Sequence, residues 1–326
     1  MAESAVIALD IGGTKLAAAA YDETGRVLAV VRTPSAPALL DAETLWRAVL
    51  SQLDKIDAEI AGRELLGVGV GCGGPMRWPS GVVSPLHIPS WRDFPLRARI
   101  QRRYSSVPVH VHNDAVCVAI GEHWRGSGRG RGNVLGMVVS TGVGGGLILD
   151  GRLINGSTGH AGHIGHVVVD PGGPLCLCGA RGCLTAFASG PKLVEWARAA
   201  GWRSRDGDTA QHLAADAVRG HPQAIAAMQR AGRALGIAIA SVARLCDLDV
   251  VTIGGGVSQA GPLLFEPVEV TLREYLRMPF GRGLRVVPTA LGQEAGLIGA
   301  AALILAADRY WRPPAVRSRA SDAREA

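Results

Sequence analysis

Residues 6–15 read VIALDIGGTK, and this stretch decides the expected fold. A short apolar run ends at Asp10 and meets a Gly-Gly turn, after which residues 16–21 and 27–31 are apolar again. Short apolar runs separated by turn residues favour β-strands, so we expect a three-stranded meander. A Gly-Gly turn is most often only a turn, but it also lets backbone N–H groups approach a ligand closely. The turn has the outline of a phosphate-binding hairpin and is not a Walker A loop, which needs G-x4-G-K-[ST] before a helix.

A second glycine-rich stretch repeats this plan. Residues 134–140 (VLGMVVS) predict a strand that leads into the glycine-rich residues 141–146 (TGVGGG), and residues 147–149 predict the next strand. The repetition indicates a duplicated domain with phosphates held between its halves. A third glycine cluster, residues 254–256, follows the apolar strand predicted at residues 249–253, and it suits the close approach of a flat ligand such as an adenine ring.

One carboxylate lies between these motifs. Residues 107–111 predict a strand that ends in His112-Asn113-Asp114, and the following residues predict a helix. Asn and Asp are favoured N-caps, so an Asp here is most often only a cap. Asp114 becomes a candidate catalytic residue because it stands between a strand of one domain and the glycine-rich segment that follows.

Residues 159–183 (GHAGHIGHVVVDPGGPLCLCGARGC) combine three histidines with three cysteines in a Gly/Pro-rich loop. The cysteines Cys176, Cys178 and Cys183 are spaced C-x-C-x4-C, and three thiolates with one imidazole form the closed tetrahedral set that structural zinc prefers. A disulfide would need an oxidising compartment, and the N-terminus does not resemble a secretory signal. Three buried free cysteines are the simpler alternative, which the clustering disfavours.

Composition excludes several classes of protein. The 326 residues are 48% hydrophobic and 19% charged, which is typical of a globular chain long enough for two domains. The longest uncharged runs are broken by glycines and fall short of the roughly 18 to 20 residues of a membrane-spanning helix. We therefore expect a soluble, cytoplasmic protein without membrane contact. The net charge of +6 comes almost wholly from arginine, and the cluster at residues 125–132 (RGSGRGRG) is better explained by a loop than by a nucleic-acid interface.

The rest of the chain predicts alternating helices and strands. Helical spacing of apolar residues predicts an amphipathic helix at residues 41–61 and several helices between residues 191 and 245. The Gly/Pro-rich residues 71–91 predict an ordered functional loop without regular structure. A helix at residues 262–276, a last strand at residues 284–287 and a closing helix at residues 292–307 complete the prediction.

Taken in order, these motifs resemble the ROK family of repressors, open reading frames and sugar kinases, over roughly residues 6–307. The resemblance implies an α/β chain with the two-domain actin-like or hexokinase-like ATPase fold, in which duplicated RNase H-like domains surround a cleft. We expect a small domain at residues 1–117, to which a closing helix at about residues 292–308 returns. A large domain with the zinc loop would span residues 118–291, and residues 309–326 would form a basic, disordered tail.

The resemblance also implies roles for individual residues. Asp114 would be the catalytic base, and Asn113, Asp114 and His166 would contact the sugar. His166 would also be the fourth zinc ligand beside the three cysteines. Mg²⁺ would bridge the phosphates with Asp10 near it. The residues implied to bind ATP are Asp10, Gly12, Gly13, Thr14, Lys15, Thr141, Gly142, Gly144, Gly254, Gly255 and Gly256. A homodimer or homotetramer is expected by analogy with the family.

The sequence departs from the family pattern at three expected sugar contacts. Family kinases usually carry glutamates where this chain has His163 and Thr185, and often an Asn where it has His87. A carboxylate can accept hydrogen bonds from two adjacent hydroxyls, whereas a neutral imidazole has one acceptor nitrogen and a threonine carries no charge. Glucokinase activity with transfer to the 6-hydroxyl is the first expectation, with an amino sugar, an N-acylhexosamine or a cyclitol as alternative substrates.

Two other classes of function remain open from the sequence. A non-catalytic sugar-binding protein would explain the loss of both glutamates, although the retained Asp10, Asp114 and glycine motifs favour a chain that handles ATP. A DNA-binding repressor of this family carries an added helix-turn-helix domain of roughly 80 residues. The first strand expected here begins at about residue 5, which leaves no room for one.

Overall fold

The computed structural model describes residues 3–13, 15–34, 40–204 and 206–312, and in this part of the chain it contains two five-stranded sheets built on one plan. The first sheet comprises β1 (Ser4–Ile11), β2 (Lys15–Tyr21), β3 (Val27–Pro34), β4 (Glu64–Cys72) and β7 (Val109–Asn113). The second comprises β8 (Val134–Val139), β9 (Val143–Leu149), β10 (Arg152–Leu153), β11 (Val250–Gly254) and β12 (Arg285–Pro288).

The strand order is the same in both sheets. The order is β3-β2-β1-β4-β7 in the first and β10-β9-β8-β11-β12 in the second. In each sheet the first three strands form an antiparallel meander, and the remaining two continue the sheet in parallel. The duplication predicted from the two glycine-rich hairpins is therefore confirmed, together with the α/β fold class.

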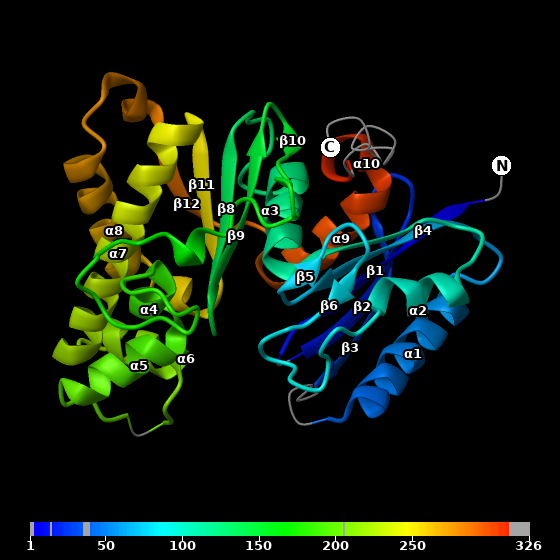
Figure 1. Ribbon diagram of the computed structural model, residues 1–326, viewed down its shortest axis with the longest axis horizontal. Helices are drawn as coiled ribbons and strands as arrows, with labels where there is room; N and C mark the ends of the chain where they lie inside the picture. Colours follow the sequence, from blue (N-terminus) through cyan, green and yellow to red (C-terminus); the bar gives the residue numbers. More distant parts are fainter. Residues whose placement is uncertain (1–2, 14, 35–39, 205, 313–326) are drawn as a thin grey trace, which may run out of the picture.

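Helices α1 (Ala42–Glu59) and α2 (Leu96–Arg103) cover the outer face of the first sheet (Figure 1). Side chains alternate along a strand, so β1 sends Ile7 and Leu9 into this outer core and Val6 and Ala8 to the opposite face. Asp41 caps α1 by accepting hydrogen bonds from the backbone N–H groups of its first turn. The two faces of the first sheet thus belong to two different cores.

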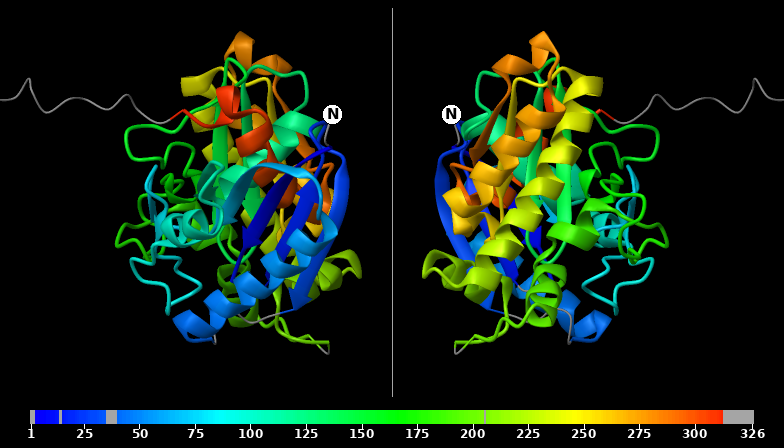
Figure 2. Two further views of the ribbon diagram at one scale, coloured as in Figure 1. Left: turned by 90° about the vertical axis from the view of Figure 1, so that its right-hand side faces the viewer. Right: turned by 90° about the vertical axis from the view of Figure 1, so that its left-hand side faces the viewer.

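The outer face of the second sheet is covered by a layer of helices, of which the two longest run in front of the strands in the right-hand view of Figure 2. The helices of this layer are α4 (Leu184–Ala188), α5 (Gly190–Ala199), α6 (Ala210–Val218), α7 (Pro222–Cys246) and α8 (Pro262–Tyr275). Helix α7 is buried along much of its length and packs closely on α8. A Cβ atom on Gly236 would lie 2.6 Å from the Cβ of Thr271, so this packing requires a residue without a side chain.

Two helices lie between the sheets (Figure 1). Helix α3 (Asp114–Arg125) packs on the inner face of the second sheet, and α9 (Ala295–Leu305) packs on the inner face of the first. They cross in direct backbone contact, because a Cβ atom on Gly121 would lie 2.3 Å from the carbonyl oxygen of Ala295. In the reverse direction, a Cβ atom on Gly299 would lie 1.7 Å from the carbonyl oxygen of Cys117. The short α10 (Ala307–Tyr310) follows α9.

The structure departs from the sequence predictions in three places. The glycines of residues 144–146 lie within β9 rather than in the turn before it, and α3 packs directly on them. The loop predicted to lack regular structure contains a short hairpin of β5 (Met76–Arg77) and β6 (Val82–Val83), and α2 was not predicted. The closing helix begins with the 3-10 turn η5 (Gly292–Glu294) and ends at residue 305.

Three further 3-10 turns complete the described part: η2 (Ile164–His166), η3 (Gly256–Ala260) and η4 (Pro279–Gly283). The boundary predicted after residue 117 falls within the continuous helix α3, and the division into domains stays a prediction. Residues 309 and 310 of the predicted tail belong to α10, where Tyr310 is buried, and from position 313 onward the tail lies outside the described residues. Among the described helices, none is both long and apolar enough to cross a membrane.

Candidate functional site

Asp114 is the first residue of α3 and lies at the carboxyl end of β7. Asn113 is the N-cap, and its Oδ1 accepts hydrogen bonds from the backbone N–H groups of Ala115 (3.0 Å) and Val116 (3.4 Å). The cap is therefore supplied by Asn113, and Oδ1 of Asp114 also accepts a hydrogen bond of 2.8 Å from the backbone N–H of Ala115. A Cβ on Gly73 would lie 3.8 Å from Oδ2 of Asp114, so the glycine-rich segment after β4 passes beside this carboxylate.

The second glycine-rich motif touches the start of α3. A Cβ on Gly144 would lie 2.7 Å from the Cβ of Ala115, the residue after Asp114. Gly142, in the turn between β8 and β9, has no atom within 4 Å of the position of a Cβ, and Thr141 beside it is exposed. The motif thus packs tightly at Gly144 and leaves open space at Gly142, where backbone can approach a ligand.

The third cluster adjoins the same end of the second sheet. Gly255 has a φ of 95°, which favours glycine, and a Cβ there would lie 2.3 Å from the carbonyl oxygen of Val139. Val139 ends β8, immediately before the turn that contains Thr141 and Gly142. The predicted phosphate turn and the predicted adenosine motif, Gly254 to Gly256, are therefore neighbours in space.

Asp10 is buried near the end of β1, and Gly12 and Gly13 follow it. A Cβ on Gly296 would lie 3.0 Å from Oδ2 of Asp10, so this carboxylate faces the N-terminal turn of α9. The N-terminus of a helix is a favourable place for a negative charge. Gly13 packs against His87, since a Cβ on Gly13 would lie 2.7 Å from the Cβ of His87. Thr14 and the side chain of Lys15 lie outside the described residues.

Asp10 and Asp114 lie at the same edge of the first sheet. Strands β1 and β7 both pair with β4 in parallel, and Asp10 is opposite Gly71 while Asn113 is opposite Cys72. Burial, followed by the charges of Asp114 and Asp10, raises the pKa of the Cys72 thiol well above its usual range. Cys72 is thus kept as a neutral thiol between the two carboxylates.

The predicted sugar contacts His163 and Thr185 border the same region of β9. His163 and His166 stack with ring centroids 5.3 Å apart, at the two ends of η2. A Cβ on Gly165 would lie 2.0 Å from the carbonyl oxygen of Val143 and 2.6 Å from Oγ1 of Thr185. The start of β9 is therefore touched by α3 on one side and by η2 on another. His87 lies against the first glycine turn instead.

His166, Cys176, Cys178 and Cys183 form a compact ligand set, and their donor atoms all lie within 4.8 Å of one another. Sγ of Cys178 is 3.6 Å from Sγ of Cys183, and Sγ of Cys176 is 3.7 Å from Nδ1 of His166. A disulfide requires sulfurs about 2.05 Å apart, whereas tetrahedral zinc with bonds of about 2.3 Å separates its sulfurs by about 3.8 Å. The donor set fits structural zinc. Hydrogen bonds from the Ala180 amide and neighbouring thiols lower the pKa of Cys178.

His112 was not predicted as part of the site. Its ring is buried, its Nδ1 accepts a hydrogen bond of 2.8 Å from the backbone N–H of Asn113, and its Nε2 lies 2.8 Å from Oδ1 of Asn155. Because Nδ1 accepts, Nε2 must carry the proton and donate it to Asn155. Burial lowers the pKa of His112 to about 4, so the ring is neutral and holds the backbone next to Asp114. A buried polar residue before an Asn-Asp pair could have signalled this role.

The comparisons with known proteins agree on one family. Residues 6–307 match the family model described as the ROK family. Glucokinase of Streptomyces coelicolor is 34% identical over 317 residues, which cover 91% of this chain and 96% of that protein. N-acetylmannosamine kinase of Citrobacter koseri is 33% identical over 298 residues, which cover 91% of this chain and 97% of that protein.

Solved structures give the same result. A ROK family glucokinase from Streptomyces griseus in complex with glucose and AMPPNP is 33% identical with a TM-score of 0.78, and the match covers 92% of this chain and 99% of that one. A ROK family transcriptional regulator, a homologue of the Escherichia coli MLC protein, is 27% identical with a TM-score of 0.82. That match covers 93% of this chain and 78% of the regulator.

Proposed function

This chain belongs to the ROK family and is an ATP-dependent sugar kinase, and from this premise we propose that it transfers the γ-phosphoryl group of ATP to the 6-hydroxyl of glucose. The observation that carries the proposal is the position of Asp114. It begins a helix that packs on the second glycine-rich motif, and the glycine-rich segment after β4 passes its carboxylate. A sugar hydroxyl there and a phosphate at the glycine turns would be neighbours.

Asp114 acts as the general base in this proposal. A sugar hydroxyl is a poor nucleophile, and a carboxylate within hydrogen-bond reach can accept its proton as the phosphoryl group transfers. Asn113 caps α3 and fixes the start of the helix, and His112 holds the N–H of Asn113 from the other side. The carboxylate is thus oriented by the half-buried Asn113, a proposed sugar contact, and by the buried His112 behind it.

ATP would be held by the three glycine motifs. The described residues proposed to contact it are Asp10, Gly12, Gly13, Thr141, Gly142, Gly144, Gly254, Gly255 and Gly256, and Thr14 and Lys15 remain predictions from the sequence. Mg²⁺ would neutralise charge on the β- and γ-phosphates, and Asp10 is the carboxylate proposed to lie near it. The buried position of Asp10 at the edge shared by β1 and β4 supports this role.

The ligand set of His166, Cys176, Cys178 and Cys183 is proposed to hold a structural zinc ion. Such an ion would fix η2 and with it His163, because His166 ends η2 and its ring stacks on that of His163. Since η2 also packs on Val143, the zinc loop would position one wall of the sugar site rather than take part in the reaction.

The substrate is glucose or a close relative of it. His163 and Thr185 offer fewer acceptors to adjacent hydroxyls than carboxylates would, so discrimination at those hydroxyls is expected to be weak. Because N-acetylmannosamine kinases are as similar in sequence as glucokinases, an N-acylhexosamine is the second candidate, and other amino sugars and cyclitols follow. A cytoplasmic location and a homodimer or homotetramer remain predictions from the family, and no nucleic-acid or membrane partner is proposed.

A substrate panel tests the proposal. Purified protein with Mg-ATP is offered glucose, mannose, N-acetylmannosamine, N-acetylglucosamine and a cyclitol, and phosphorus NMR assigns the phosphorylated position. Glucose should give the highest kcat/KM, 2-deoxyglucose should be phosphorylated, and 6-deoxyglucose should be inert because it lacks the acceptor. Phosphorylation of 6-deoxyglucose would contradict transfer to the 6-hydroxyl, and absence of turnover on the whole panel would contradict the kinase activity itself.

A further inference from the structure

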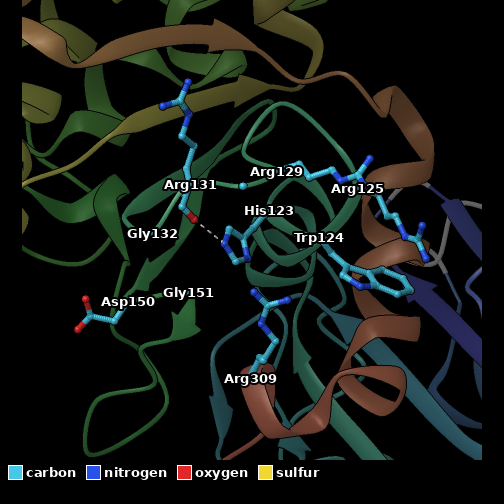
Figure 3. A pocket seen from close by; sticks show the side chains of 10 residues that line it. His123, Trp124, Arg125, Arg129, Arg131, Gly132, Asp150, Gly151 and Arg309 are labelled. Carbon is cyan, nitrogen blue, oxygen red and sulfur yellow. Dashed lines mark hydrogen bonds between the residues drawn. The ribbon is translucent and has the colours of Figure 1, made fainter.

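A cavity of about 660 Å³ lies at the end of α3 opposite to Asp114 (Figure 3). Its walls are the last residues of α3, the loop of residues 126–132, the turn between β9 and β10, and α10. Nine to eleven residues of helix separate its α3 residues from Asp114, which is roughly 15 Å at 1.5 Å per residue. The cavity is therefore distinct from the proposed sugar and ATP sites, and its volume is in the usual range for small-molecule pockets.

The cavity collects positive charge. Four arginines line it, Arg125, Arg129, Arg131 and Arg309, together with a single carboxylate, Asp150. Figure 3 shows Arg309 extending from α10 toward His123, Arg125 and Arg129 to one side of it, and the Arg131 side chain leaving the loop in another direction. The excess of guanidinium groups over carboxylates makes the cavity a place where an anion is attracted.

Some arginines elsewhere on the surface are neutralised by acidic side chains. Arg99, Arg103 and Arg219, which lie on or beside helices elsewhere, each pair with an acidic side chain. None of the four guanidinium groups at the cavity forms an ion pair within the residues that the structure describes. Other described arginines, Arg47 and Arg102 among them, form no ion pair either, so what sets these four apart is that they line one hollow.

The walls of the cavity are fixed by buried hydrogen bonds. His123 is 4% exposed, and its Nε2 lies 2.9 Å from the carbonyl oxygen of Arg131 while its Nδ1 lies 2.6 Å from the hydroxyl of Tyr310. A carbonyl only accepts, so Nε2 carries the proton and Nδ1 accepts from Tyr310. One neutral imidazole thus holds both the backbone of the loop at Arg131 and α10, the segment that carries Arg309.

The loop itself is also well held. Glu122 is fully buried, and its carboxylate accepts hydrogen bonds from the backbone N–H groups of Ser127 (2.8 Å), Ala290 (3.1 Å) and Leu291 (2.9 Å). At the other end of the loop, the N–H of Gly132 donates to Asp249 at 3.0 Å. The guanidinium of Arg125 lies over the ring of Trp124 at 4.4 Å and donates to the carbonyl of Thr24. The cations are therefore presented by ordered backbone.

We propose that this cavity binds a small anion that carries a diphosphate group. Guanidinium groups match phosphate oxygens in paired hydrogen bonds and stay charged at all working pH values, so several of them around one hollow favour a multiply charged phosphate over a carboxylate. Gly130 has no atom within 4 Å of the position of a Cβ, so it leaves room for the ligand close to the backbone. The cavity joins α10, which follows the helix packed on the first sheet, to a loop and turn of the second sheet.

Calorimetry tests the proposal with two sources of the same chemistry, inorganic pyrophosphate and ADP. The full-length protein is first saturated with AMPPNP, magnesium and glucose, so that the proposed active site is filled, and each ligand is then titrated in. One equivalent of pyrophosphate should bind, and Arg129→Ala/Arg309→Ala, which removes one cation from each wall, should weaken binding at least tenfold. If ADP binds more tightly than pyrophosphate at the same site, the ligand is a nucleotide; if it binds no more tightly, an inorganic or sugar diphosphate is the ligand.

The control variant is Arg47→Ala/Arg102→Ala, which removes two exposed arginines from α1 and α2 and the same amount of charge. It should bind pyrophosphate within twofold of the unchanged protein. Equal weakening in both double variants would show a non-specific charge effect and overturn the proposal, as would no binding at millimolar pyrophosphate. A short RNA that binds more tightly and displaces pyrophosphate would overturn it in favour of a nucleic acid. Thermal unfolding and kcat of both variants confirm that each is folded.

Discussion

His112 and Asn155 form a hydrogen bond of 2.8 Å between Nε2 and Oδ1, and both side chains are buried. The bond joins β7 of the first sheet to the segment that follows β10 of the second, one residue away from Asn113. It is therefore both a link between the two halves and a support for Asn113 and the proposed base, Asp114. Its dependence on a neutral imidazole has a measurable consequence.

The free energy of unfolding should fall as the pH falls from about 6.5 to about 4. In the unfolded chain His112 takes up a proton near the ordinary histidine pKa of about 6.5, whereas burial lowers its pKa to about 4 in the folded protein. Between these values the unfolded state binds more protons, so stability is present above pH 6.5 and is lost toward pH 4. For this one group the loss between pH 7.5 and pH 5 is roughly 2 kcal/mol.

Urea unfolding at both pH values measures this loss in the unchanged protein and in His112→Gln. Other buried histidines also titrate, so the loss of unfolding free energy between the two pH values is compared between the two proteins. His112→Gln should lose about 2 kcal/mol less over this interval, and His212→Gln, a half-buried control on α6, should behave like the unchanged protein. Equal losses in all three would show that His112 is not the responsible group.

Asp114→Asn should lower kcat by about 10² to 10⁴-fold, because the amide cannot accept the sugar proton as a carboxylate does. The KM for ATP should change little, since Asp114 is not proposed to contact the phosphates. Steady-state kinetics at fixed magnesium measures both values. Glu266→Gln, an exposed change on α8, is the control. A variant that keeps more than a tenth of the original kcat would exclude Asp114 as the base.

Cys178→Ser should lower zinc content, stability and sugar affinity together. A closed four-ligand site contributes on the order of 10 kcal/mol to local folding when zinc binds, so loss of one thiolate should be large. Metal analysis, thermal unfolding and glucose calorimetry give the three readings. Cys246→Ser, a partly buried thiol at the end of α7, should alter none of them. Full sugar affinity in metal-free Cys178→Ser would contradict the proposed role of the zinc loop.

Gly144→Ala should destabilise the protein by about 1 to 3 kcal/mol, because the new methyl group would lie 2.7 Å from the Cβ of Ala115 and would force α3 or β9 to shift. Gly283→Ala is the matched change, since no atom lies within 4 Å of the position of its Cβ. Gly142→Ala is also uncrowded but lies in a proposed phosphate turn, so it should raise the KM for ATP without loss of stability. Urea unfolding and ATP kinetics separate the three variants, and a stable Gly144→Ala would refute the packing argument.

The sequence was most informative where local chemistry determines structure. Apolar runs ending in glycine predicted β1, β2, β8 and β11 within a few residues, and cysteine spacing predicted a ligand set that the fold assembles. The same local information could not show that Gly144 belongs to a strand, because only the approach of α3 requires a glycine there. Tertiary contact, rather than turn geometry, explains that residue.

Long-range contacts account for what was missed. Nothing adjacent in sequence to His112 indicates Asn155, which is 43 residues away, and the loop at residues 125–132 gave no sign that Arg309 would lie beside it. The contact of His87 with sugar was implied by the family resemblance and stays a prediction, while its packing against Gly13 was not visible in the sequence. The roles of these side chains depend on which elements meet, and patterns along one segment do not contain that information.

Gly121 and Gly299 set the separation of the two sheets. Where α3 and α9 cross, each of these glycines lies against the backbone of the facing helix, with no side chain of its own between them. A larger residue at either position would push α3 and α9 apart, and with them the two sheets. The absence of a Cβ atom at these two glycines thereby sets the distance between the proposed base on α3 and the first sheet, on which the proposed phosphate turn of Gly12 and Gly13 lies.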